Sequence, residues 1–226
     1  MSETSQLALK VWGELACFTR PEMKVERVSY PVMTPSAARG VLEAIFWKPE
    51  IQWQIREIWV LSPIRHFSIL RNEVNSKAVF SSAVKGSHFY AEEDRAQRHT
   101  LALKDVSYVI RADIVIRPGV PYPLKKYQEM FNRRAERGQY FHHPCLGCRE
   151  FPAHFALPDG SEQPFEVDDD LGLMLFDLDY EKQASGLPSK SGRGTPRFFH
   201  ARLEHGVLRV PTDLYAEVAH AAQGTR

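Results

Sequence analysis

The order of strand and helix patterns in residues 1–157 limits the possible folds more than any other feature of the sequence. Runs rich in apolar, β-branched and aromatic residues predict strands, and Thr34 followed by Pro35 predicts the start of a helix through Phe46. When the polar segment near 75–98 is set aside as an insertion, the elements read strand, helix, strand, strand, helix, strand. This order is typical of the split βαβ, or ferredoxin-like, fold, in which two helices cover one face of an antiparallel sheet. The four strands of this order are expected at 7–18, 52–61, 103–116 and 151–157, and 67–74 is expected as another extended stretch.

Residues 158–226 predict a β-rich extension. An apolar run at 171–178 predicts a strand, and His205-Gly206 predicts the turn of a hairpin over 197–210. The chain is therefore expected to be an α+β protein, with a ferredoxin-like (RRM-like) N-terminal domain over 1–157 and a β-rich C-terminal domain over 158–226. Three tryptophans are predicted to pack in the core: Trp47, Trp53 and Trp59.

The second predicted helix carries an unusual concentration of positive charge. Lys125 and Lys126 fall in its first turn, where they face the positive end of the helix macrodipole, and Gly138 is expected just past its end. At about 100° per residue, one sector of the helix is basic and the opposite sector is apolar. The basic sector holds Lys126, Arg133 and Arg137, and the apolar sector holds Leu124, Tyr127 and Phe131. Two interpretations stay open: a face that binds phosphate, and a basic face that is simply solvated.

The charge composition limits where on the protein a polyanion could bind. The formal net charge of the 226 residues is +1, so a polyanion would have to be held by local patches rather than by the field of the whole protein. No apolar run has the length of a membrane span, and residues 1–9 lack the pattern of a signal peptide. The three cysteines are too few for a disulfide framework. We therefore expect a cytoplasmic protein without membrane partners.

Four segments together resemble one known family. They are 26–30 with 33–40 (including Thr-Pro-Ser-Ala-Ala-Arg-Gly), 46–49, 130–134 (including Phe-Asn-Arg-Arg) and 147–151. Over about residues 6–211 the chain resembles the CRISPR-associated RAMP-superfamily protein of type I-C systems, the d subtype of the fifth Cas family. The resemblance implies an endoribonuclease that cuts the repeat hairpin of CRISPR precursor RNA without a metal or other cofactor. It also implies that the product stays bound by its 5′ handle and joins other subunits in a Cascade complex.

Metal-free RNA cleavage makes the ribose 2′-OH the nucleophile and leaves a 2′,3′-cyclic phosphate. The site then needs a base, an acid and a cation for the phosphorane. The resemblance implies a tyrosine near the end of the first helix and a Lys-His pair at the start of the second. Those positions carry Phe46, Lys126 and Tyr127. Phe46 has no hydroxyl and can only pack or stack, and a tyrosine with an ordinary pKa of about 10 is a poor base. We therefore expect slow cleavage that depends on Lys126, or recruitment of another acid or base.

The candidate catalytic residues are thus Lys126, Tyr127 and His142. Tyr127 is equally compatible with a packing role, and His142 and His143 with ordinary loop positions. The candidate RNA-binding residues are Arg27, Arg39, Phe46, Lys125, Arg133, Arg134, Arg137, Lys190 and Arg193. The other interpretations are an ion pair of Arg27 with Glu26 or Glu43, a solvated Arg39, and a plain surface loop around Lys190 and Arg193.

Other functions remain as alternatives. The first is a catalytically weak subunit that binds guide RNA as a scaffold and also binds duplex DNA without sequence preference. The second is a metal-dependent nuclease built on acidic residues, which are Asp168, Asp169, Asp170, Asp177 and Asp179. A zinc site at Cys145 and Cys148 would need His142, His143 or His154, but the spacing matches no standard zinc module and favours a buried thiol pair.

Overall fold

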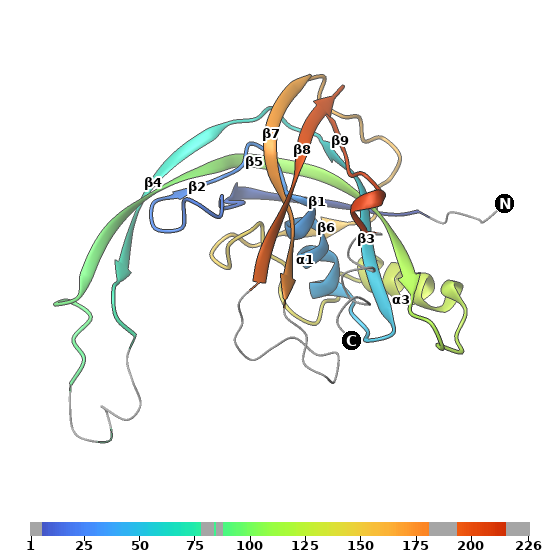
Figure 1. The fold of residues 1–226 in the computed structure, drawn as a ribbon, viewed down its shortest axis with the longest axis horizontal. Helices are drawn as coiled ribbons and strands as arrows, with labels where there is room; N and C mark the ends of the chain where they lie inside the picture. The colour runs from blue at the N-terminus through green and yellow to red at the C-terminus, as the bar shows by residue number, and fades with distance from the viewer. Residues whose placement is uncertain (1–5, 78–83, 85–87, 181–193, 216–226) are drawn as a thin grey trace.

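The computed structural model describes residues 6–77, 84, 88–180 and 194–215 (Figure 1). Within this part, nine strands form one sheet that two longer helices accompany. The elements are β1 (Leu7–Ala16), β2 (Arg27–Val28), α1 (Pro35–Ile45), β3 (Ile51–Val60), β4 (His66–Val74), β5 (Arg95–Ile116), α3 (Leu124–Glu136), β6 (His154–Ala156), β7 (Asp169–Tyr180), β8 (Gly194–Glu204) and β9 (Val207–Arg209). The predicted α+β class is confirmed.

The sheet runs in the order β6-β1-β5-β3-β9-β8-β7, and each neighbouring pair is antiparallel. β4 is not part of this order: it pairs with the first half of β5, and the two strands extend as a long arm (Figure 1). The predicted start of β5 at 103 is therefore wrong, because the strand already begins at Arg95 inside the supposed insertion. Both faces of this two-stranded arm are largely exposed, so its sequence lacks the apolar alternation that marks a half-buried strand.

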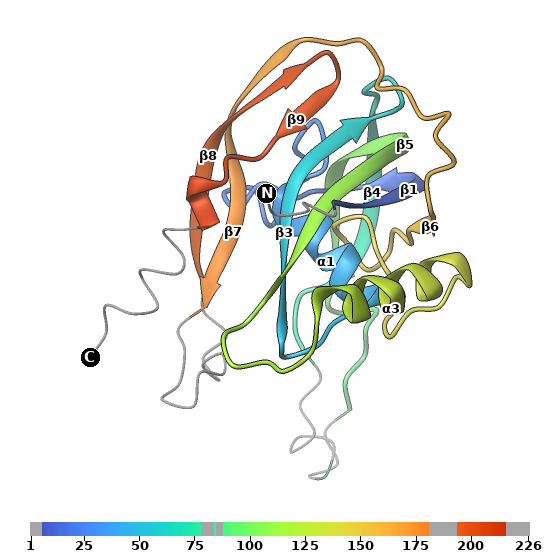
Figure 2. The ribbon, with the colours of Figure 1, turned by 90° about the vertical axis from the view of Figure 1, so that its right-hand side faces the viewer.

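The two helices lie on the same side of the sheet (Figures 1 and 2). The Thr34 hydroxyl accepts a hydrogen bond from the backbone N–H of Ala37 at 3.2 Å, which confirms the predicted N-cap of α1. α3 buries Tyr127, Phe131 and Ala135, and the Phe131 ring meets that of Trp53 edge-on at 4.9 Å. The apolar face predicted for this helix is thus its core face. Neither helix of the described chain is long and apolar enough to cross a bilayer.

The C-terminal strands continue the sheet and close over α1. β9 pairs with β3, and β8 joins β9 through a turn in which His205 and Gly206 both have positive φ, at 51° and 74°. Positive φ at both central residues is the requirement of a tight β-hairpin turn, so the predicted hairpin is confirmed. On the other side of α1, Ser36 and Arg39 donate hydrogen bonds to Asp177 of β7. α1 is therefore held between β3 and β7 of the same sheet.

Candidate functional site

The N-terminus of α3 is open and positively charged. The helix begins after Pro123, has no side-chain cap, and has no acidic residue in its first turn. Lys125 is well exposed, and its ammonium lies 4.0 Å from the Glu129 carboxylate, one turn on. Free backbone N–H groups and lysines at a helix N-terminus together favour an anion. This end of α3 is therefore suited to a phosphate.

Lys126 is a second exposed cation at the N-terminus of α3. Its Nζ lies 3.1 Å from the centroid of the Tyr122 ring, a cation–π contact that restrains the side chain without neutralising its charge. Arg133 and Arg137 are exposed on the same helix, as their spacing predicts. Among the described residues, no carboxylate pairs with any of these three cations. The charge of this face is thus available to a ligand.

Tyr127 belongs to the core rather than to the surface. Only 2 % of the residue is exposed, and its hydroxyl has no hydrogen-bond partner within the described structure. Burial raises the pKa of Tyr127, and the nearby Glu50 carboxylate and Tyr122 raise it further. A base for a 2′-OH needs a lower pKa and access to the RNA, so this environment favours the packing role.

Replacing Tyr127 with phenylalanine separates the two roles. Since the hydroxyl makes no hydrogen bond, we expect Tyr127→Phe to cleave RNA within about twofold of the wild-type rate. Its midpoint of urea denaturation should be equal or higher, because a buried, unpaired polar atom is removed. A cleavage rate that fell a hundredfold with an unchanged midpoint would instead make the hydroxyl a catalytic group.

Phe46 is buried beneath the half-buried side chain of Arg134. Phe46 is 0 % exposed, and the Arg134 guanidinium carbon lies 5.6 Å from its ring centroid. Nη1 of Arg134 donates to the carbonyl oxygen of Ile45 at 2.7 Å, and so satisfies a free carbonyl at the end of α1. Of the two roles open to Phe46, packing or stacking on RNA, the burial of the ring favours packing. Arg134 links the two helices instead of reaching for phosphate.

Arg27 has acidic partners other than those considered from the sequence. Its guanidinium contacts the carboxylates of Glu150 at 3.3 Å and Glu73 at 3.6 Å, and donates to Cys148 Sγ at 3.3 Å. Neither Glu26 nor Glu43 pairs with it in the described structure. These contacts come from β4 and from the loop after α3, so Arg27 joins three segments rather than offering a free fork to RNA.

Arg39 is likewise engaged inside the protein. It donates to both carboxylate oxygens of Glu43, at 2.9 and 3.0 Å, and to Asp177 at 2.7 Å. Burial lowers the pKa of Arg39, but the two carboxylates outweigh burial and raise it above its ordinary value. These ion pairs favour a structural role over a solvated Arg39, because the side chain fastens α1 to β7; its contact with RNA stays a prediction.

We expect Arg39→Ala to lower the free energy of unfolding by about 1–3 kcal/mol, because it leaves two partly buried carboxylates without a counter-charge. Urea denaturation measures the change. Arg202→Ala is the matched control, since Arg202 pairs at 3.4 Å with Asp170 at an exposed position and should cost at most about 1 kcal/mol. Equal losses in the two variants would contradict a structural role for Arg39.

An exposed aromatic loop lies beside the ends of both helices. Phe141 and His142 donate backbone hydrogen bonds to the carbonyl oxygen of Ala44, at 2.8 and 3.0 Å, so the loop is fixed to the end of α1. Tyr140, Phe141 and Trp47 are 46 %, 73 % and 54 % exposed. Trp47 was predicted to be in the core and is not. Exposed rings next to cations are suited to stacking on unpaired bases. The signal in the sequence was the aromatic pair directly before His142 and His143.

Lys126 and His142 lie toward opposite ends of α3. The loop of His142 docks at the end of α1, where Arg134 also binds. At about 1.5 Å per residue, Arg134 is roughly 12 Å along the helix axis from Lys126. The structure therefore does not gather the predicted catalytic residues into one centre. Lys190 and Arg193 lie outside the described residues.

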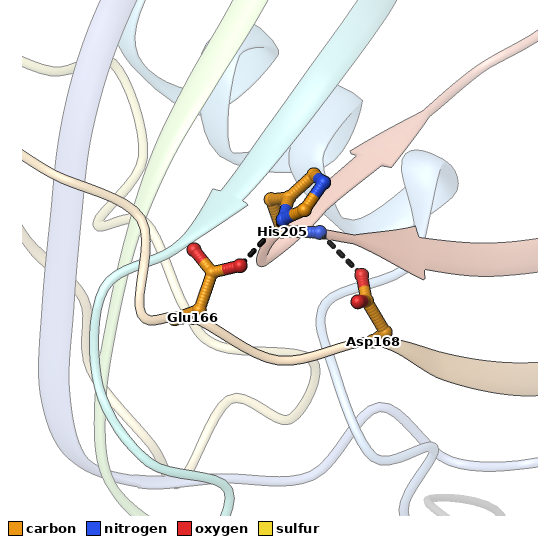
Figure 3. A group of neighbouring side chains, drawn as sticks. All are labelled: Glu166, Asp168 and His205. Atoms are coloured by element: carbon orange, nitrogen blue, oxygen red, sulfur yellow. Dashed lines mark hydrogen bonds and ion pairs between the residues drawn. The ribbon is translucent and has the colours of Figure 1, made fainter.

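The acidic residues considered for metal binding have other partners. Asp177 pairs with Arg39, Asp179 with Arg197 at 3.6 Å, and Asp170 with Arg202. In the described chain, one group has metal-ligand spacing: Glu166, Asp168 and His205 at the β8–β9 turn (Figure 3). There His205 donates its backbone N–H to Asp168 at 2.7 Å, and its ring contacts Glu166. These exposed contacts fix the turn.

The cysteine pair also differs from the prediction. The sulfur of Cys148 points toward Cys17, which precedes it by most of the chain, and not toward Cys145. Within the described residues, no third His, Cys, Asp or Glu ligand completes a zinc site at Cys145 and Cys148. A buried thiol pair exists, but its members are Cys17 and Cys148.

Comparison with known proteins identifies the relatives of this chain. The Cas5d model of the family described as CRISPR-associated protein (Cas_Cas5) matches residues 6–211. A relative from Thermus thermophilus named CRISPR pre-crRNA endoribonuclease Cas5d is 49 % identical over 230 residues, which cover 97 % of each chain. A relative of the same name from Mannheimia succiniciproducens is 48 % identical over 231 residues, covering 94 % of this chain and 97 % of that one.

Solved structures share the fold. A CRISPR-associated protein aligns with a TM-score of 0.65 at 20 % identity, covering 92 % of this chain and 93 % of that one. A chain of a CRISPR RNA-guided surveillance complex aligns with a TM-score of 0.50 at 13 % identity, covering 96 % and 98 %. At these identities the likeness is evidence for the fold alone.

Proposed function

Because this chain belongs to the Cas5d family of CRISPR-associated proteins, we propose that it is an endoribonuclease that cleaves precursor CRISPR RNA. Near-full-length identity of 49 % to a protein named for this activity is the observation that carries the proposal. The exposed cations Lys126, Arg133 and Arg137 of α3 agree with an RNA substrate, since none of the three has a carboxylate partner in the described structure.

We propose that cleavage proceeds by attack of the ribose 2′-OH within the repeat hairpin and needs no metal. In this mechanism the Lys126 ammonium stabilises the negative charge that develops on the phosphorane. Lys125 and the free N–H groups of the helix N-terminus orient the phosphate, and Arg133 and Arg137 hold the RNA backbone further along. The axial separation of Lys126 from the loop of His142 supports a role of His142 in binding the RNA rather than at the same phosphate.

The strand order supports a ferredoxin-like N-terminal domain over 1–157. β6, β1, β5 and β3 are consecutive neighbours, all antiparallel, and α1 and α3 lie on one of their faces. This is the arrangement expected of the split βαβ fold. Within 158–226, the described residues 158–180 and 194–215 then form the β-rich extension, which continues the sheet through the pairing of β9 with β3.

We propose that the β4–β5 arm contacts other subunits of a Cascade complex while the 5′ handle of the product stays bound. Its exposed apolar side chains include Phe67, Leu70, Val74 and Leu101. A two-stranded ribbon is only marginally stable alone in water, and these apolar side chains provide a surface for a partner.

The alternative is a scaffold subunit that binds guide RNA and cleaves it weakly or not at all. The burial of Phe46 and Tyr127 favours it, because neither residue offers a base to the RNA. The same basic face would also bind duplex DNA without sequence preference, with an affinity that falls steeply with salt. Filter binding that stays flat with duplex DNA at low salt would remove this DNA-binding proposal.

The test of the proposed function is incubation of end-labelled repeat RNA with the protein in EDTA. We expect one discrete cut, with the 5′-handle product retained by the protein on a native gel. Tight binding without a cut would support the scaffold, and a cut that appears only after Mg²⁺ is added would support metal-dependent chemistry.

A further inference from the structure

The end of β1 and the loop after α3 approach each other unusually closely. The backbone N–H of Cys17 donates to the carbonyl oxygen of Leu146 at 3.0 Å. Gly147 follows with φ of +85°, and a Cβ built on it would lie 2.1 Å from the Cys17 carbonyl oxygen. Only glycine fits there, since real Cβ atoms do not approach so closely. This contact presses the next residue, Cys148, against Cys17.

The two sulfur atoms share one small polar environment. Cys148 Sγ lies 3.5 Å from the carbonyl oxygen of Cys17, and the two thiols are close enough to shift each other's pKa. The Thr19 hydroxyl oxygen lies 3.5 Å from Cys17 Sγ and 3.9 Å from Cys148 Sγ. Nη1 of Arg27 donates to Cys148 Sγ at 3.3 Å. The Arg27 guanidinium thus donates to Cys148 Sγ and the Thr19 hydroxyl lies beside it, an arrangement that stabilises a thiolate.

The ionisation of the pair is divided unequally. The hydrogen bond from Cys17 lowers the pKa of Cys148; burial opposes this, and Arg27 and Thr19 add to the lowering, which brings the value to about 6. The same hydrogen bond, together with burial, raises the pKa of Cys17. The contact with Arg27 and these opposite shifts favour Cys148 over Cys17 as the thiolate of the pair.

We propose that Cys148 and Cys17 form a site of reversible oxidation, in which Cys148 reacts with a hydroperoxide and Cys17 then closes a disulfide. The Cys148 thiolate attacks the terminal peroxide oxygen, the O–O bond breaks, and an alcohol or water leaves with a proton from the solvent. Cys148 is then a sulfenic acid. The sulfur of Cys17 attacks the sulfenic sulfur, its proton leaves with the hydroxyl as water, and the S–S bond forms. Two thiols are oxidised and one peroxide is reduced.

Burial explains why the pair reacts with itself rather than with other chains. Cys17 is 0 % exposed and Cys148 is 9 % exposed, so neither residue is open to a protein thiol, and the oxidant in this proposal is a small hydroperoxide. Cys145 is more exposed but lacks the Arg27 contact, and its pKa is raised by burial. Cys145 is thus the internal control for reactivity that follows exposure alone.

The first experiment treats the full chain with hydrogen peroxide and maps its peptides by mass spectrometry without reduction. We expect a Cys17–Cys148 cross-link, lighter by two hydrogen atoms, that dithiothreitol reverses. Cys145→Ser should form the same link, while Cys17→Ser should stop at a sulfenic acid on Cys148 that dimedone traps. A disulfide through Cys145 would overturn the proposal, and so would the absence of an oxidised product at Cys148 in Cys145→Ser or in Cys17→Ser.

The second experiment measures iodoacetamide alkylation of Cys148 against pH. We expect wild type to reach half its maximal rate near pH 6. At pH 7, Arg27→Leu should react roughly tenfold more slowly or worse, because a thiol without a cationic partner is only a few per cent ionised. Arg71→Leu is the control, since Arg71 pairs with Glu73 and Glu150 without touching sulfur. Equal rates in the two variants, or a wild-type midpoint near the ordinary thiol value, would overturn the assignment. None of these readouts depends on RNA cleavage.

Discussion

Lys126→Ala is expected to lower the cleavage rate of repeat RNA by about 10²- to 10³-fold, the usual effect of losing one group that stabilises charge in the transition state. The ammonium is exposed beside the helix N-terminus and has no carboxylate partner in the described chain. RNA affinity should change by only a few-fold, because Lys125, Arg133 and Arg137 still hold the backbone. Single-turnover kinetics, together with filter binding, separates the two effects.

Lys125→Ala is the matched control for this prediction. It removes the neighbouring lysine, which is also exposed but pairs with Glu129 at 4.0 Å. We expect a cleavage rate within about tenfold of the wild-type rate and a loss of RNA affinity similar to that of Lys126→Ala. The reason is that Lys125 orients the phosphate and does not stabilise the phosphorane. If both lysine variants lost rate equally, Lys126 would be one part of a diffuse basic patch and not a catalytic residue.

Gly147→Ala is expected to have the largest effect on stability, at least about 4 kcal/mol of unfolding free energy, which includes strain at a positive φ and a steric clash. The atom that a Cβ would meet is the backbone oxygen of Cys17 at 2.1 Å, and a backbone atom next to the central sheet cannot move away. Urea denaturation of the wild-type protein and of Gly147→Ala measures the difference in unfolding free energy. Loss of folded protein on expression is the extreme form of the same result.

Gly160→Ala is the comparison that isolates the clash. Gly160 has a φ of +89°, but no atom lies within 4 Å of a Cβ built on it. We therefore expect a loss of only about 1–2 kcal/mol, the cost of the left-handed conformation alone. Equal losses at the two glycines would show that the loop after α3 can shift away from β1.

Local signals in the sequence were sufficient for most of the elements. The Thr34 cap, the apolar sector of α3 and the His205-Gly206 turn each depend on neighbouring residues, and the structure confirms all three. The predicted start of β5 was wrong because the first residues of this strand belong to an arm exposed on both sides, where no buried face imposes a period of two.

The candidate site was predictable only where it depends on helix geometry. The basic face of α3 follows from spacing within one helix. The pairs of Arg27 with Glu150 and of Arg39 with Asp177 do not, because these acidic residues are more than a hundred residues away in the chain and meet the arginines only through the fold. The burial of Phe46 beneath Arg134 has the same cause, since it depends on the packing of α1 against α3.

The most direct test of the proposed chemistry replaces a single ribose in the repeat RNA. Once the cut has been mapped in EDTA, the nucleotide on its 5′ side is changed to the 2′-deoxy form, and a deoxy substitution elsewhere in the hairpin serves as the control. Attack by the 2′-OH predicts that the first RNA is bound normally and not cleaved, while the control is cleaved at the wild-type rate. Cleavage of the first RNA at the same position would contradict this mechanism, because another nucleophile would then have opened the phosphodiester bond.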